Sequence, residues 1–158
     1  MNTRTRGLSL LILIALALGG CSTAVEPGLT SETPGGTIEL AVSETCVEGS
    51  DSQCVSVQGQ YIVSPAVFKT ATIEDAVASE RDGQNTVDVT FTDDGAAIVN
   101  SLTAEAVQAG GEARLVMRIG DEIRAAVTVA EPLTGDSLTI ALSPDDSAQE
   151  VVDLINKG

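Results

Sequence analysis

The sequence contains no histidine and no tryptophan, and its aromatic residues are limited to one tyrosine and two phenylalanines. Histidine is the commonest general base and a frequent metal ligand, so its absence argues against most hydrolytic and metal-dependent sites. The sequence also lacks a Gly-x-Ser-x-Gly elbow and a supported Ser-x-x-Lys pair, which argues against a serine nucleophile. We therefore predict that the chain is not an enzyme and that it uses no cofactor and no metal.

Basic residues are scarce as well. The chain of 158 residues has 8 Lys and Arg against 23 Asp and Glu, which gives a formal net charge of -15. Binding to nucleic-acid phosphates needs a clustered basic face, and stacking on bases needs aromatic rings, so we predict no nucleic-acid partner. A hydrophobic content of 43% excludes a wholly disordered chain. The length fits one ordinary domain, and the composition favours a small binding or structural module.

Long hydrophobic runs are also missing. The most apolar segment, Leu8–Leu18, follows a positive region that contains Arg4 and Arg6. This run is too short to span a bilayer as a permanent helix, and its length and flanks are typical of a signal-peptide core.

The apolar run ends in Leu18-Gly19-Gly20-Cys21. Small residues directly before a cysteine resemble the lipobox of bacterial lipoproteins, and this resemblance implies that Cys21 is acylated and becomes the new N-terminus. The alternative is an ordinary signal peptide followed by an unrelated cysteine. We predict a lipoprotein signal peptide over residues 1–20 and an extracytoplasmic protein that a lipid anchor holds to the bacterial cell membrane.

Residues 21–36 are rich in Ser, Thr, Gly, Pro and Glu and show no apolar period, which predicts a flexible tether. A folded domain is then expected over residues 37–158. Because that domain is strongly acidic, its surface repels anionic lipid head groups, and the acyl chains must hold the protein to the membrane.

The remaining cysteines form a pair. Once Cys21 is assigned to lipidation, Cys46 and Cys54 are left in an oxidising compartment. A disulfide between them would close a short loop. The alternative is a thiolate metal site, but two sulfurs without a nearby histidine make an incomplete zinc shell. The composition favours the disulfide.

Alternating apolar residues predict strands, and apolar residues at helical spacing predict helices. The expected strands lie at residues 37–43, 55–63 (one extended stretch), 73–80, 86–92, 115–119, 123–129 and 138–142. One helix is expected after Asp93-Asp94-Gly95, and a second with Ser143 as its N-cap. The order of these elements predicts an α+β fold, with an antiparallel sheet of hairpins and two amphipathic helices packed on one face.

Several of these segments together resemble the head subdomain of the first periplasmic domain of SecD, a membrane component of the bacterial protein-export machinery. The similar segments follow one another in the family's order and are residues 61–67, 73–76, 89–96, 102–103, 115–123, 131–135 and 148–158. The resemblance covers residues 59–158 and implies a head domain that contacts emerging polypeptide. Residues 37–158 are therefore expected to form a SecD head-like domain.

The departures from SecD limit what the resemblance implies. After processing, the chain is expected to keep no spanning helix, so the proton-driven motor of SecD does not carry over. The base subdomain next to the head is also missing, apart from a possible remnant at Ile38–Val42. We predict an accessory lipoprotein that contacts translocated polypeptides or Sec translocase components. The alternative is a head-like fold that binds another cell-envelope ligand and has no role in export.

Three arginines are the most prominent charge feature of the domain. Strand alternation places Arg114, Arg118 and Arg124 on the solvent side of one hairpin, as a basic stripe on an acidic body. In one interpretation they pair with Asp88 or Glu122 across strands. In the other they bind an acidic partner or an extended polypeptide.

Acidic doublets suggest calcium at first sight. Asp93-Asp94 and Asp145-Asp146 stand at expected helix starts, and Asp121-Glu122 stands in a hairpin turn. Helix capping and turn preference already explain these positions, and none has the alternating oxygen ligands of a calcium loop.

Overall fold

The computed structural model describes residues 35–158. The predicted signal peptide, Cys21 and most of the predicted tether lie outside the described residues. Within the described part, the elements are β1 (Thr37–Glu44), β2 (Cys54–Val57), β3 (Gln60–Val63), β4 (Lys69–Arg81), β5 (Gln84–Phe91), α1 (Asp93–Ala109), β6 (Ala113–Ile119), β7 (Glu122–Val127), β8 (Ser137–Ala141) and α2 (Ala148–Ile155).

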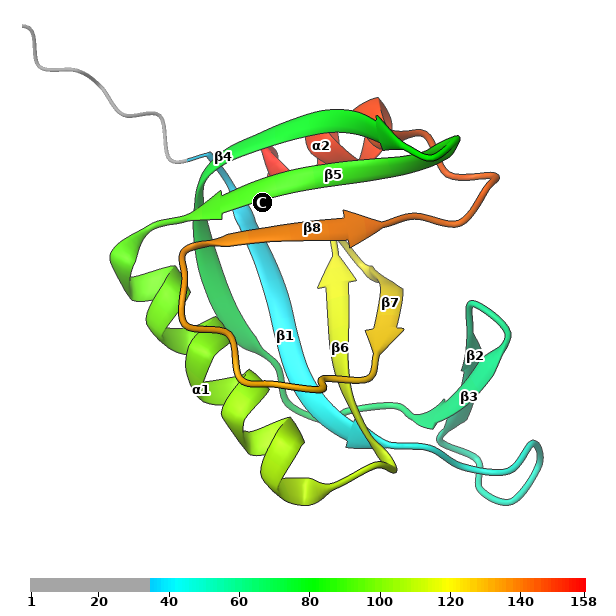
Figure 1. The fold of residues 1–158 in the computed structure, drawn as a ribbon. Coiled ribbons are helices and arrows are strands. Elements are labelled where there is room, and N and C mark those ends of the chain that lie inside the picture. Colours follow the sequence, from blue (N-terminus) through cyan, green and yellow to red (C-terminus); the bar gives the residue numbers. More distant parts are fainter. Residues whose placement is uncertain (1–34) are drawn as a thin grey trace, which may run out of the picture. The chain divides into compact units, whose positions relative to one another are not determined.

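Six strands form one antiparallel sheet in the order β7-β6-β1-β4-β5-β8, and β2 and β3 form a separate hairpin. The long strand β4 pairs with β1 through Lys69–Thr72 and with β5 through Ile73–Arg81, with a register shift between Ile73 and Asp75. Figure 1 shows that the sheet curls along β4, so that its outer strands turn towards one another. Strands β7 and β8 are the two edges of this sheet.

One hydrophobic core joins the sheet to both helices. Helix α1 packs on β4, β1, β6 and β5, and α2 packs on β4, β5 and β6. Their buried residues Val99, Leu102, Val151 and Ile155 belong to the same apolar cluster as the strands. The α+β class and the antiparallel sheet are confirmed. Packing of both helices on one face of the sheet stays a prediction.

The prediction of one extended stretch over residues 55–63 is wrong. Gln58 and Gly59 have φ values of 47° and 81°, and they form a tight turn between β2 and β3. Positive φ at both central residues is the geometry of a two-residue hairpin turn, in which the second position favours glycine. The segment therefore folds back on itself.

The predicted N-cap of the second helix is also wrong. Helix α2 begins at Ala148, and the N-cap is Ser147, whose hydroxyl accepts a hydrogen bond from the backbone N–H of Glu150. The spacing of Ser147 and Glu150 is that of a capping box, which competes with Ser143-Pro144 as a start signal. Helix α1 begins earlier than expected, at Asp93 instead of after Gly95, because Thr92 is its N-cap and the acidic pair Asp93-Asp94 lies in its first turn.

Candidate functional site

Two kinds of feature are absent from the described residues. Among residues 35–158, no group of three or more His, Cys, Asp or Glu side chains could hold a metal ion. In the same part of the chain, no helix is both long and apolar enough to cross a membrane.

Arg118 lies between an acid and an aromatic ring. Its Nε is 2.6 Å from Oε2 of Glu39 on β1, and its guanidinium carbon is 4.1 Å from the centroid of the Phe68 ring. The hydrogen bond from Arg118 holds the pKa of Glu39 below its usual value. Arg118 therefore has partners within the domain on both sides.

The other two arginines are engaged as well. Nη1 of Arg124 is 2.8 Å from Oδ1 of Asp146, and Nη2 is 2.9 Å from Oε2 of Glu122. Nε of Arg114 donates to Oε1 of Gln60 over 3.0 Å. The expected pairing with Glu122 is therefore found for Arg124, although both residues belong to β7.

The expectation that the three arginines are exposed is wrong, because all three are half-buried against their partners. Asp88, the other expected partner, pairs with Arg81 instead, with 3.0 Å between Nη2 of Arg81 and Oδ1 of Asp88. A hydrogen bond from Thr139, supported by Arg81, lowers the pKa of Asp88.

A second, smaller apolar cluster lies beside the arginines. Strand alternation predicts that Val116 and Ala126 are open to solvent, but their exposed fractions are 0% and 1%. Val57 and Ile62 of the β2–β3 hairpin cover them. The hairpin therefore occupies much of the sheet face that the sequence leaves open, because it packs there instead of extending the sheet.

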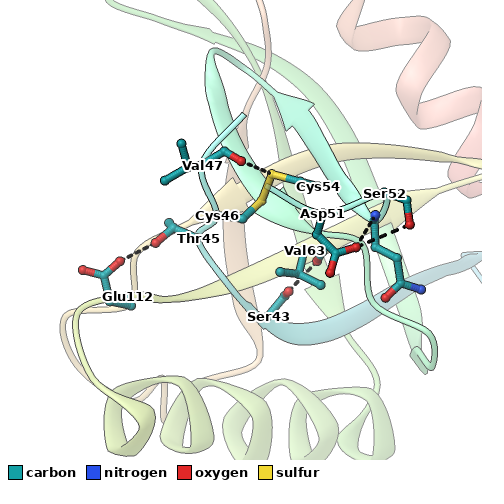
Figure 2. Close-up of a disulfide and its surroundings, with 10 residues drawn as sticks. Ser43, Thr45, Cys46, Val47, Asp51, Ser52, Cys54, Val63 and Glu112 are labelled. Carbon is teal, nitrogen blue, oxygen red and sulfur yellow. Dashed lines mark hydrogen bonds between the residues drawn. A yellow bond between two sulfur atoms is a disulfide. The ribbon is translucent and has the colours of Figure 1, made fainter. Parts of the chain in front are cut away.

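The Cys46–Cys54 disulfide is present and connects the end of β1 to the start of β2 (Figure 2). Beside it, the backbone N–H of Cys46 donates to the carbonyl oxygen of Tyr61 over 3.0 Å. The Ser43 hydroxyl donates to the carbonyl oxygen of Val63, which ties β3 to β1 (Figure 2). These bonds hold the β2–β3 hairpin in place over the smaller cluster.

Removing the disulfide should loosen this hairpin. We expect the double substitution Cys46→Ser and Cys54→Ser to lower the free energy of unfolding by about 2–3 kcal/mol, because the unfolded chain is no longer cross-linked. Urea denaturation of the variant and of the oxidised wild type measures the difference. Reduced wild type is the matched control and should unfold like the variant. Equal midpoints for oxidised wild type and variant would contradict the prediction.

An apolar groove opens between the two edges of the curled sheet. Its volume is about 470 Å³, and its wall combines α1, β6, β7, β8 and the segment between β7 and β8. The lining residues are Thr103, Leu115, Met117, Val127, Thr128, Val129, Ala130, Glu131, Leu133 and Leu138. Glu131 is the only charged residue among them. A groove of this size and polarity fits apolar side chains of a ligand.

The segment after β7 is fixed to α1. The backbone N–H of Leu133 donates to Oγ1 of Thr103 over 3.0 Å, and that hydroxyl donates to the carbonyl oxygen of Val99 over 2.9 Å. Thr103 is one of the two buried polar residues of the described domain. Sequence reasoning did not find this groove, because the edges that form it are brought together only by the curl of the sheet.

Comparisons with known proteins agree with this architecture. The family described as "SecDF, P1 head subdomain" matches residues 44–158. A solved structure entitled "Crystal structure of SecDF in Super-membrane-facing form" is similar to the chain with a TM-score of 0.50 and 16% sequence identity, over 79% of this chain and 19% of that chain. This likeness shows the fold alone. No curated protein matches the chain. The family match covers most of the chain, which therefore belongs to the SecDF P1 head subdomain family.

Proposed function

We propose that this protein is an extracytoplasmic accessory of protein export, held to the cell membrane by a lipid on Cys21, whose head domain contacts translocating polypeptides. The observation that carries the proposal is the family match over residues 44–158, which relates the domain to the export subunit SecDF. No catalytic step is part of the proposal, because the role is binding.

The groove is the contact surface that we propose. Polypeptides in transit are unfolded and present apolar side chains, which an apolar groove can remove from water. Arg118 and Arg124 are already paired with acids of the domain, so a ligand would have to break those pairs before it could use them. A role for Arg114, Arg118 and Arg124 in polypeptide binding stays a prediction.

The proposed anchor makes a separate prediction. We expect the N-terminal peptide of the mature protein to begin at an acylated Cys21, because Leu18-Gly19-Gly20-Cys21 resembles a lipobox. Mass spectrometry of the purified protein measures the modification. A Cys21→Ser variant should lose the acylation and leave the membrane fraction. A variant that stays membrane-bound with an unmodified N-terminus would contradict the anchor.

Cross-linking in intact cells tests the contact. A photoreactive residue at Val129, in the groove wall, should give adducts with secreted precursors or with translocase subunits. The same residue at Val77, which is 51% exposed on β4 and does not line the groove, is the matched control and should give none. Adducts at Val129 that contain only other envelope components would instead support a binding module without a role in export.

A further inference from the structure

The two edges of the curled sheet differ in whether their backbone is covered. On β7, the carbonyl oxygen of Arg124 accepts a hydrogen bond from Nε2 of Gln58 over 3.0 Å, and that of Ala126 accepts one from Nε2 of Gln60. Both glutamines belong to the β2–β3 hairpin. Side-chain amides therefore occupy carbonyl groups that another strand would need, which is a common way to protect a sheet edge.

The backbone of β8 is arranged differently. The backbone N–H of Phe91 donates to the carbonyl oxygen of Asp136 over 2.7 Å, and that of Leu142 donates to the carbonyl oxygen of Asn85 over 3.0 Å. Hydrogen-bonded pairs alternate along an antiparallel ladder, so Leu138 is a hydrogen-bonding partner of β5.

By the same alternation, the backbone N–H and C=O groups of three residues point away from β5, namely those of Ser137, Thr139 and Ala141. Within residues 35–158, no hydrogen bond satisfies these outward backbone groups. The strand thus presents a short row of free donors and acceptors. Its Leu138 side chain lies in the wall of the apolar groove.

We propose that the edge of β8 pairs with an extended polypeptide segment, which joins the sheet as an additional strand and places alternate side chains in the groove. This inference rests on the proposed function and specifies how the polypeptide is held. An extended backbone is the ligand that satisfies both the N–H and the C=O groups of a sheet edge, and alternate side chains then provide the specificity.

Charge defines the segment further. The part of the chain that follows the predicted signal peptide has six basic residues and 23 acidic ones, so it is strongly negative. Four of the six are engaged within the domain, namely Arg81, Arg114, Arg118 and Arg124. The only charged residue that lines the groove is Glu131. The segment that fits is therefore apolar at alternate positions and neutral or basic elsewhere.

The geometry fixes which residues of the ligand do what. The segment is taken to run antiparallel to β8, as every strand of this sheet runs to its neighbours. Side chains opposite Leu138 then lie on the groove side of the sheet, and their backbone N–H groups point away from β8. Residues opposite Thr139 have their N–H groups directed at β8 and their side chains on the other face. One alternate set of ligand N–H groups is used for pairing, and the other set is free.

Synthetic peptides test directly which alternate set of ligand N–H groups pairs with β8. The probe is a nine-residue peptide of alternating valine and threonine with a lysine at each end, titrated into the full-length protein in detergent. Valine should enter the groove, so threonine N–H groups should pair with β8. N-methylation of the threonines should weaken binding about tenfold or more, because hydrogen bonds are lost and methyl groups block pairing. N-methylation of the valines should change affinity by less than about threefold.

A pair of variants tests the protein side. Ala141→Pro removes an outward N–H and leaves the hydrogen bonds to β5, since proline is tolerated at a solvent-facing edge position. We expect it to weaken binding of the probe about tenfold. Ala141→Thr keeps the N–H and should bind like wild type. The methylated peptides need no variant, so they decide the question even if Ala141→Pro fails to fold.

The outcomes separate the inference from the proposed function. If both methylated peptides bind like the probe and a Leu133→Ser substitution in the groove weakens binding, the groove contacts polypeptide but strand pairing is overturned. If the unmethylated probe does not bind at all, groove contact with polypeptide and strand pairing are both overturned.

Discussion

Replacing Gly95 with alanine is expected to lower the free energy of unfolding by about 3 kcal/mol or more. A Cβ atom at this position would lie 2.1 Å from the backbone carbonyl oxygen of Thr72 on β4. That carbonyl is itself held in place, because it accepts a hydrogen bond from the backbone N–H of Thr92, the N-cap of α1. Helix and strand would have to separate to admit one methyl group, and backbone cannot move aside as a flexible side chain can.

Gly111→Ala is the matched control for Gly95→Ala. Gly111 lies just after α1, and nothing lies within 4 Å of the position of its Cβ. Urea denaturation followed by circular dichroism should give a control midpoint close to wild type and a much lower midpoint for Gly95→Ala. Similar midpoints for the two variants would show that α1 does not approach β4 as closely as the structure indicates.

The sequence predicted the local parts of this fold well. The turn-rich residues 81–85 between two alternating segments predict the hairpin of β4 and β5, and in the structure Asp82 and Gly83 of this turn both have positive φ. Gly110-Gly111 predicts the end of the first helix, because glycine is common just after a helix, and Gly110 is the C-cap of α1 in the structure. These features depend on neighbours in the chain, so a single sequence contains the information that determines them.

The site was harder to predict because its neighbours are distant in the sequence. Strand β1 pairs with both β4 and β6, so Glu39 meets Arg118 only through the order of the strands. Alternation correctly separated the two faces of β6, but it could not show that the β2–β3 hairpin covers one of them. The burial of Val116 follows from that hairpin and has no local signal in β6 itself.

The Cys46–Cys54 disulfide is an intermediate case. It followed from the number of cysteines and the expected compartment rather than from any knowledge of the fold. The structure adds what the bond holds together: the end of β1 and a hairpin whose glutamines Gln58 and Gln60 protect the edge of β7. The disulfide thereby supports the difference between the two sheet edges.

The second large effect is expected at Gly36, which the sequence places in the flexible tether. The structure instead packs it between β4 and the end of α2, where its carbonyl oxygen accepts a hydrogen bond from the N–H of Ile73 over 2.9 Å. Its φ is 101°, and a Cβ atom would lie 1.9 Å from the carbonyl oxygen of Ile155. Gly36→Ala therefore combines a strained backbone with a clash between fixed groups, and we expect a loss of about 3–5 kcal/mol in the free energy of unfolding.

A control for Gly36→Ala separates strain from the clash. Gly49 also has a positive φ, 73°, but nothing lies within 4 Å of its Cβ position. Gly49→Ala should therefore lower the free energy of unfolding only by the strain of holding alanine in the left-handed conformation, about 1–2 kcal/mol. Chemical denaturation gives both values, and hydrogen exchange should show faster opening of the last turn of α2 in Gly36→Ala alone, because that turn contains Ile155. If the two variants lose the same stability, the chain at Gly36 is not confined by α2, and the folded domain begins at β1 as the sequence suggests.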